Sequence, residues 1–491
     1  MADQRPNIIL FNPDQWRGDV LGYAGNAAAR TPVLDQLTRN DAVAFTRTFC
    51  QNPVCTPSRC SFMTGWYPHV RGHRTMFHML RPDEPVLLKT LKDSGYTVWW
   101  GGKNDLVPAQ HSLEPYCDIY HKAPPGTLPP WAIDRQAEWR GEPGSDTYYS
   151  FLAGRLPLKD GASRYADSDW AHVQGAIDFI RSAPHERPFC LYLPLIYPHP
   201  PYAVEEPWYG LIDRAALPPR LLQPDWADKP AILKGIATRQ RLETWDESRW
   251  SELRAVYYGM CARVDHQLGL LLDALQAAGL YDDTALFFFS DHGDFTGDYG
   301  LVEKTQNTFE DCLTRVPFLV KPPKGTAIRA GVRDALVELI DLPATVEELA
   351  GLPRRHTHFG RSLLPLIAGA ARTHRDAVFC EGGRLHGETH CMELESDISK
   401  APGDLYAPRL AWQRQEGPEH GKAVMARTAQ YKYVRRLYET DELYDLRADP
   451  GEMHNCIADP ALAPVLVQLQ ERLLTFYMET ADVVPHDIDR R

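Results

Sequence analysis

Two apolar runs, far apart in the chain, each end in acidic and polar residues, and this pattern constrains the fold most. Residues 7–11 are followed closely by Asp14, and residues 284–290 are followed directly by Asp291 and His292. Short apolar runs without polar alternation are typical of parallel strands that are buried on both faces. Because ligands of open α/β sheets bind outside the carboxyl ends of the strands, we expect the two polar ends to share one site.

Extended and helical patterns alternate over most of the chain. Further extended segments cover residues 43–49, 96–100 and 189–193, and helical patterns cover residues 31–37, 86–95 and 248–278. This alternation predicts an α/β sandwich in which helices flank a large, mostly parallel sheet. Residues 106–164 break the pattern with proline clusters, and we expect them to form an insert that shapes access of the substrate.

The pattern changes near residues 368–375. Beyond that point four short extended segments and a helix follow, at residues 377–381, 424–427, 431–436, 443–446 and 461–478. Such segments predict a small antiparallel sheet that is closed by a helix. We therefore expect two domains, a catalytic α/β domain over residues 1–372 and an α+β subdomain over residues 373–491.

Composition and charge limit the classes of partner. The 491 residues are 44% hydrophobic, and 53 basic against 65 acidic side chains give a net charge of −12. This balance disfavours nucleic acid or an anionic membrane as partner, and a small anionic substrate needs a locally positive pocket. The start of the chain lacks the pattern of a signal peptide, and no run is long enough to cross a bilayer, so we expect a cytoplasmic protein. The ten cysteines show neither metal-ligand spacing nor a disulfide framework, so we expect them to be reduced.

Asp14, Asp291 and His292 together indicate a cation site. Two carboxylates and an imidazole are ligands that divalent cations accept in proteins. Taken alone, the Asp-His-Gly at residue 291 also fits a turn that the aspartate caps.

A second signal is the segment Cys55-Thr56-Pro57-Ser58-Arg59. An isolated Cys-x-Pro-x-Arg also fits a buried structural cysteine in a turn. Here it stands in a series that further includes Asp14-Gln15, Gly102-Lys103, His199-Pro200-Pro201, Asp291-His292-Gly293, Lys304 and Tyr431-Lys432. In this combination and order, over nearly the whole chain, the sequence resembles the type I sulfatases of the alkaline phosphatase superfamily.

The resemblance implies an alkaline phosphatase-like fold and a modified nucleophile. In this family a formylglycine-generating enzyme oxidises the cysteine that corresponds to Cys55. The hydrated aldehyde is a geminal diol, so one oxygen can attack sulfur or phosphorus and the other can later expel the ester group. By the same resemblance one divalent ion, Ca²⁺ or Mn²⁺, is held by Asp14, Gln15, Cys55, Asp291 and His292.

The resemblance also assigns roles around the nucleophile. Arg59 is expected beside the formylglycine, where a fixed guanidinium adds positive field. Lys103 and Lys304 are expected to bind the sulfate oxygens, and His199 to hydrogen-bond or protonate the leaving oxygen. Considered singly, either lysine also fits a solvated surface charge and His199 a structural loop histidine.

Two departures from the common sulfatase pattern matter. Gln15 and His292 resemble the branch of choline sulfatases and phosphonate monoester hydrolases, in which manganese as well as calcium is found. The histidine that many sulfatases carry two residues after the lysine is missing after Lys103. The nearby side chains His73, Arg74 and His78 are candidates to replace it or to bind substrate, and each also fits a packing or surface role.

The sequence thus predicts hydrolysis of a sulfate ester by a formylglycine nucleophile on a divalent metal ion. The alternative is a phosphonate monoester or phosphodiester hydrolase that uses the same groups. A non-catalytic anion-binding protein that kept the fold is disfavoured, because nucleophile and ligands are all present. A cysteine that acts directly is disfavoured too, because a thiol ester of sulfate has no evident exit. Related branches often form dimers or tetramers, so a homo-oligomer is one open possibility, and the natural substrate stays open as well.

Overall fold

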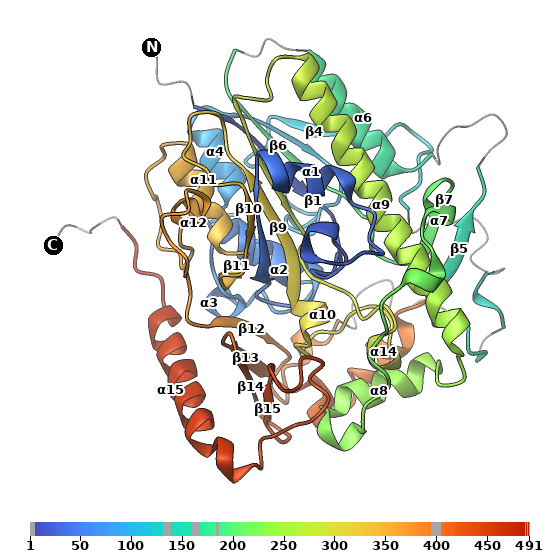
Figure 1. Ribbon diagram of the computed structural model, residues 1–491. Coiled ribbons are helices and arrows are strands. Elements are labelled where there is room, and N and C mark those ends of the chain that lie inside the picture. The colour runs from blue at the N-terminus through green and yellow to red at the C-terminus, as the bar shows by residue number, and fades with distance from the viewer. Residues whose placement is uncertain are drawn as a thin grey trace.

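The computed structural model describes residues 5–130, 139–142, 144–158, 166–182, 186–393, 404–486, 488 and 490. A nine-stranded sheet forms its centre, and a four-stranded sheet near the C-terminus packs below it in the view of Figure 1. The spatial order of the large sheet is β10 (Gly331–Arg333), β2 (Val43–Phe49), β9 (Arg315–Lys321), β8 (Thr284–Phe289), β1 (Asn7–Asn12), β6 (Phe189–Pro194), β3 (Thr97–Gly101) and β4 (Ile119–His121), with β11 (Val337–Glu338) against β2.

Strand β1 lies in the middle of this sheet and explains why its sequence is continuously apolar. It pairs in parallel with β6 on one side and with β8 on the other. Ile8 and Leu10 belong to the hydrophobic core on one face, and Ile9 and Phe11 to the core on the opposite face. Because successive side chains of a strand point to opposite faces, two buried faces require an uninterrupted apolar run.

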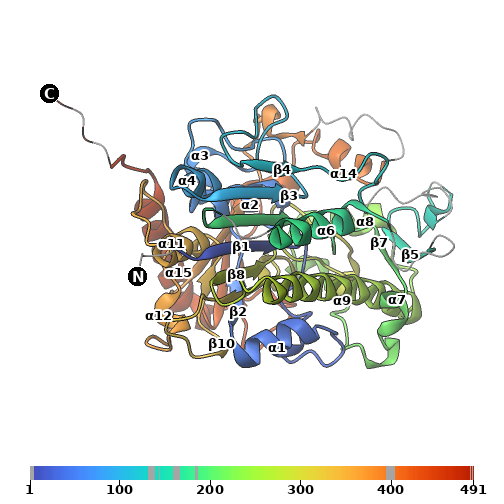
Figure 2. The same cartoon turned by 90° about the horizontal axis from the view of Figure 1, so that it is seen from above.

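Helices cover both faces of the large sheet (Figure 2). One face packs against α2 (Cys55–Thr64), α4 (Leu87–Asp93) and α11 (Asp341–Leu349), and the other against α1 (Pro32–Asn40), α6 (Ser168–Arg181) and α9 (Glu247–Ala277). The shorter helices are α3 (Pro68–Arg71), α7 (Trp208–Leu211), α8 (Ala231–Gln240), α10 (Asp311–Thr314), α12 (Leu364–Ile367) and α14 (Ala407–Trp412). The predicted sandwich with a large, mostly parallel sheet is therefore confirmed.

The second sheet is antiparallel, as predicted. Its order is β12 (Val378–Gly382), β13 (Ala423–Arg427), β14 (Tyr431–Arg436) and β15 (Glu442–Asp445). Helix α15 (Ala463–Thr480) closes it through Leu469, Leu473 and Phe476. The boundary between two domains at residue 372 stays a prediction.

Strand β9 is a central strand that the sequence did not predict. It carries Pro317, and proline is normally confined to edge strands or bulges because it cannot donate a ladder hydrogen bond. The register between β9 and β2 shifts between Phe45 and Thr48, opposite the proline. A bulge in β2 thus accommodates a residue that otherwise argues against a central strand.

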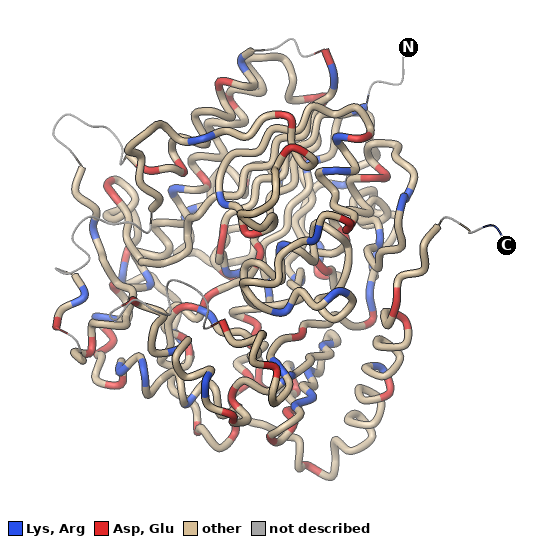
Figure 3. The backbone as a smooth tube through the Cα atoms, turned by 180° about the vertical axis from the view of Figure 1, so that it is seen from behind, with Lys and Arg blue, Asp and Glu red and all other residues tan. Residues whose placement is uncertain are grey.

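Part of the predicted insert, residues 106–164, lies outside the described residues. Its described part contains β4 and also β5 (Leu152–Leu156), which pairs in parallel with β7 (Tyr202–Glu205). Basic and acidic positions are interspersed along the chain trace in the rear view (Figure 3). No helix among the described residues combines the length and the apolar composition that a membrane span requires.

Candidate active site

The ends of β1 and β8 lie side by side, as their sequences predicted. Phe11 pairs with Phe288 across the parallel ladder, so both strands stop at the same edge. The amide of Asn12 donates to the carbonyl of Phe289 at 3.1 Å, and the backbone N–H of Gln15 donates to Asp291 Oδ1 at 3.0 Å. These bonds join the two loops that carry the acidic residues.

Cys55 is the first residue of α2, so the Cys-x-Pro-x-Arg segment forms a helix rather than a turn. Every residue of this helix is buried, and Gly65 ends it with a left-handed backbone (φ 72°). The hydroxyl of Ser58 donates to the carbonyl of Asp291 at 2.6 Å. The helix start is therefore fixed against the loop that follows β8.

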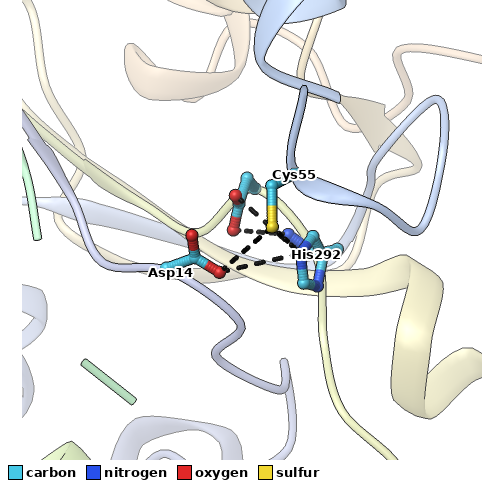
Figure 4. A group of neighbouring side chains, drawn as sticks. Asp14, Cys55 and His292 are labelled. Atoms are coloured by element: carbon cyan, nitrogen blue, oxygen red, sulfur yellow. Dashed lines mark hydrogen bonds and ion pairs between the residues drawn. The ribbon is translucent and has the colours of Figure 1, made fainter. Parts of the chain in front are cut away.

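Asp14, Cys55, Asp291 and His292 converge on one buried point, with candidate ligand atoms all within 4.8 Å of one another. The thiol of Cys55 lies 3.1 Å from His292 Nε2 and 3.6 Å from Asp14 Oδ1, and Figure 4 shows both side chains turned toward it. His292 Nδ1 donates to the carbonyl of Gly293 at 2.9 Å, which leaves the lone pair of Nε2 directed into the cluster. Two carboxylates, a sulfur or its oxygen replacement, and a neutral imidazole nitrogen form a donor set that fits a divalent cation.

Electrostatics keep these groups in the states that a ligand needs. Burial lowers the pKa of His292, so the ring is neutral. Burial alone would raise the pKa of Asp14, but Lys103 and Arg59 outweigh it and hold that pKa well below its usual range. Burial, together with the charge of Asp14, raises the pKa of the Cys55 thiol. An unmodified Cys55 is therefore a poor nucleophile, because the reactive form of a cysteine is the thiolate.

Arg59 connects the carboxylates of Asp14 and Asp291. Its Nε donates to Asp291 Oδ2 at 2.9 Å and its Nη2 to Asp14 Oδ2 at 3.0 Å, while Nη1 donates to Asn12 Oδ1 at 3.0 Å. The side chain is completely buried. One planar guanidinium thus fixes residues that follow two different strands.

Lys103, Lys304 and His199 line the same cavity as Cys55, and the volume of this cavity is about 660 Å³. Lys103 Nζ lies 2.6 Å from Asp14 Oδ2 and 2.8 Å from Asp105 Oδ2. Asp105 thus occupies the position, two residues after the lysine, at which many sulfatases carry histidine. Four of the five residues that the sequence assigned to catalysis, Cys55, Lys103, His199 and Lys304, line the cavity. The fifth, Arg59, is buried against Asp14 and Asp291, and the roles of all five stay predictions.

Lys304 uses all three of its N–H donors. Its Nζ donates to Gln15 Oε1 at 2.7 Å, to Glu303 Oε1 at 2.6 Å and to His199 Nε2 at 3.0 Å. His199 Nδ1 donates to the carbonyl of Pro200 at 2.6 Å, so Nε2 accepts from the lysine. Burial and the charge of Lys304 lower the pKa of His199, which makes the ring neutral.

Gln15 has both ends of its amide occupied. Nε2 donates to Asp294 Oδ2 at 2.5 Å while Oε1 accepts from Lys304, and the backbone is left-handed (φ 66°). Tyr202 donates to the same Asp294 carboxylate at 2.8 Å. The role of Gln15 as a metal ligand stays a prediction, since its amide oxygen here faces the ammonium of Lys304.

His73, Arg74 and His78 have other partners. His73 Nε2 lies 3.0 Å from Glu84, and its Nδ1 donates to the carbonyl of His78. Arg74 forms an ion pair with Glu388 at 2.8 Å. His78 Nδ1 lies 2.6 Å from the hydroxyl of Thr75. The cavity wall instead includes Met76 and Phe77 of the same segment.

Glu303 is a site residue that the sequence did not identify. It is buried with a left-handed backbone (φ 68°), and it accepts hydrogen bonds from Arg409 Nη1 at 2.7 Å and Tyr406 at 3.2 Å as well as from Lys304. Its position next to Lys304 was the one available signal. Tyr406 and Arg409 come from the C-terminal part of the chain, and no local sequence pattern predicts that they contact Glu303.

Comparisons with known proteins bear on the family and on the fold. A model of the family described as Sulfatase matches residues 6–352. Arylsulfatase K of Danio rerio is 28% identical over 92% of this chain and 80% of its own, and the multifunctional alkaline phosphatase superfamily protein PehA of Trinickia caryophylli is 25% identical over 97% and 96%. The structure of the phosphonate monoester hydrolase of Agrobacterium radiobacter superposes with a TM-score of 0.74 at 23% identity, covering 99% of this chain and 100% of that one. A 2-O GAG sulfatase superposes with a TM-score of 0.71 at 21% identity, covering 98% and 93%.

Proposed function

The chain belongs to the sulfatase family, whose model spans residues 6–352, and from this premise we propose that it hydrolyses a sulfate ester with formylglycine at position 55. The observation that carries the proposal is the convergence of Cys55 with Asp14, Asp291 and His292 at the floor of a cavity that two lysines also line. As a geminal diol, the modified side chain would offer one oxygen for attack and a second for release of the ester group. A divalent ion held by Asp14, Asp291, His292 and residue 55 would supply Lewis acidity.

The two lysines bind the sulfate in this scheme. An ammonium has three donors, and Lys103 donates to Asp14 and forms an ion pair with Asp105, which leaves it a donor for a sulfate oxygen. Lys304 has none left, so a sulfate oxygen that binds it must replace one of its partners. The neutral His199 is the most weakly held of the three, because Gln15 and Glu303 lie closer and Glu303 is charged.

His199 then faces the ester oxygen that leaves. That oxygen accepts a proton, so His199 must carry one on Nε2 at that moment. Once the sulfate has replaced His199 as a partner of Lys304, Nε2 takes up a proton from solvent and passes it to the leaving oxygen, which returns the ring to its neutral form. Removal of such a general acid typically costs a factor of 10²–10⁴ in rate.

The alternative is hydrolysis of phosphonate monoesters or phosphodiesters by the same groups. Gln15, His292 and the similarity to PehA, a protein named as multifunctional, favour it. The two activities are separated by comparing kcat/KM for 4-nitrophenyl sulfate with kcat/KM for 4-nitrophenyl phenylphosphonate. We expect the sulfate to be the better substrate, and a strong preference for the phosphonate would reverse the assignment.

The test of the modified nucleophile is intact-protein mass spectrometry. Protein from a host with a formylglycine-generating enzyme should show conversion of Cys55, and turnover should rise in proportion to the converted fraction. An unconverted Cys55 from such a host would favour a non-catalytic anion-binding protein instead.

A further inference from the structure

The cavity above Cys55 is much larger than a sulfate group. Its volume of about 660 Å³ lies within the range of pockets that enclose drug-sized ligands. Beyond the lysines and His199, its lining includes a group of large apolar and aromatic side chains: Met76, Phe77, Phe151, Leu405, Tyr406 and Leu410. They come from three parts of the chain: the segment after α3, the residue before β5, and α14 with the residues that precede it.

We propose that the alcohol half of the ester is an apolar, ring-containing group of two or more fused rings, held between Phe77 and the pair Phe151–Tyr406. This inference rests on the proposed function, because the cavity is interpreted as the place of the leaving group. The rings of Phe151 and Tyr406 meet edge to face, with centroids 5.3 Å apart. Phe77 is 56% exposed, which places it at the mouth, where a bound ring would cover it.

Phe151 is held at a fixed position relative to the loop that carries His199. Phe151 has a left-handed backbone (φ 61°), which is an outlier for a bulky residue. Its carbonyl accepts from the N–H of Tyr202 at 2.7 Å, and the strands that follow, β5 and β7, are paired. Tyr202 follows His199 by three residues, so the ring of Phe151 and the imidazole that faces the leaving oxygen are held by one short hydrogen-bonded unit.

The charged side chains of the cavity wall argue against a polyanionic substrate such as a multiply sulfated sugar. Arg409 donates to Glu303 at 2.7 Å, and Arg140 lies against the ring of Tyr148 at 3.9 Å and donates to its carbonyl. Among the acids of the wall, Glu393 accepts from the N–H of Met76 at 2.8 Å. A second anionic group on the substrate would compete for these partners and would meet carboxylates nearby, whereas an apolar ring leaves these interactions in place.

Binding to an inactive protein tests this inference without turnover. Full-length Cys55→Ala protein in buffer with Mn²⁺ is titrated with 2-naphthyl sulfate, followed by naphthalene fluorescence, and phenyl sulfate and glucose 6-sulfate are used as competitors. We expect 2-naphthyl sulfate to bind at least tenfold more tightly than glucose 6-sulfate, with phenyl sulfate between them. Equal or tighter binding of glucose 6-sulfate would overturn the inference.

Two variants locate the binding surface. Phe77→Ala, combined with Cys55→Ala, should weaken 2-naphthyl sulfate about fivefold to tenfold, which is the cost of losing an aromatic contact, and should change glucose 6-sulfate less than twofold. Tyr406→Leu in the same background also removes the hydroxyl that donates to Glu303, so it should weaken both ligands, and 2-naphthyl sulfate more. Tyr120→Ala is the matched control, because Tyr120 is a 37% exposed aromatic residue on β4 outside the cavity. Equal losses for both ligands, or no loss for either, would place the ring elsewhere and refute the proposal.

These results are separable from those for the proposed function. Tight naphthyl binding that depends on Phe77, in a converted wild-type protein that turns over no sulfate ester, would keep the apolar subsite and reject the sulfatase activity. If the protein turns over aryl sulfates and substitution of Phe77 or Tyr406 has no effect, the sulfatase activity is kept and the apolar subsite is rejected.

Discussion

Replacing Arg59 by lysine tests whether the guanidinium is what holds the candidate cation site together. In the structure it donates to Asp291 Oδ2 at 2.9 Å, Asp14 Oδ2 at 3.0 Å and Asn12 Oδ1 at 3.0 Å, in complete burial. Lysine keeps the charge, but its ammonium is a point donor that lacks the planar fork of arginine. It can therefore retain one carboxylate partner but cannot bridge both.

The magnitude follows from the bonds that are lost. A hydrogen bond to a charged group contributes about 1.5–3 kcal/mol to stability, so loss of one carboxylate contact should lower the free energy of unfolding by about 2 kcal/mol. Groups that orient metal ligands typically change metal affinity by about 10–100-fold when mutated. We expect Arg59→Lys to weaken Mn²⁺ binding within that range.

The assay is competition for Mn²⁺ between the full-length protein and a fluorescent chelator, together with urea unfolding. Turnover is not the readout, because Arg59 belongs to the segment that resembles the modification tag. Arg427→Lys is the matched control, since Arg427 holds Asp311 by two bonds of 3.1 and 2.9 Å outside the site. It should lose comparable stability with unchanged Mn²⁺ affinity, and wild-type affinity in Arg59→Lys would refute the reasoning.

Three further outcomes are expected. Cys55→Ala should abolish turnover with an unchanged circular dichroism spectrum, and residual activity above about 1% would contradict the scheme. Glu303→Gln leaves the buried Lys304 and the partly buried Arg409 without their carboxylate, so urea unfolding should show a loss of about 3 kcal/mol, and a loss below about 1 kcal/mol would show that these ion pairs are not needed. Burial and a neighbouring histidine lower the pKa of His172 to about 4, so the unfolded chain binds this proton more tightly than the folded one. The free energy of unfolding should therefore fall by about 3 kcal/mol as the pH falls from about 6.5 to about 4. His172→Gln should remove this part of the pH dependence. If the free energy of unfolding, measured with urea at each pH, depends on pH in the variant as it does in the wild type, His172 is not the responsible group.

The centre of the site was predictable because it depends on local sequence and on one rule of sheet geometry. Apolar runs fixed β1 and β8, and parallel pairing brought Asp14 and Asp291 to one edge. The position of Cys55 at the start of α2 adds a third segment, which the sequence placed through its resemblance to a known family. These residues lie at the ends of regular elements, where sequence patterns are most informative.

The surroundings of the site were not predictable, because they depend on contacts between distant segments. Glu303 meets Arg409, 106 residues later, through a bend with a positive φ that no local pattern indicates. Phe151 reaches the cavity through another positive φ within an irregular insert. Even β9 was missed, because Pro317 disfavours a central strand unless its partner strand has a bulge.

The positive side chains around Cys55 are already paired with carboxylates. Three cations around Cys55, namely Arg59, Lys103 and Lys304, all lie within 3.0 Å of carboxylates, which belong to Asp14, Asp291, Asp105 and Glu303. Among the residues that the structure describes, the site therefore has fixed donor positions but no surplus of positive charge, in a protein whose net charge is −12. Attraction of an anionic ester then depends on the charge of the proposed cation, while discrimination among esters depends on the apolar wall. Substitutions in the insert or before α14 can accordingly change which ester is accepted without touching the groups that cleave it.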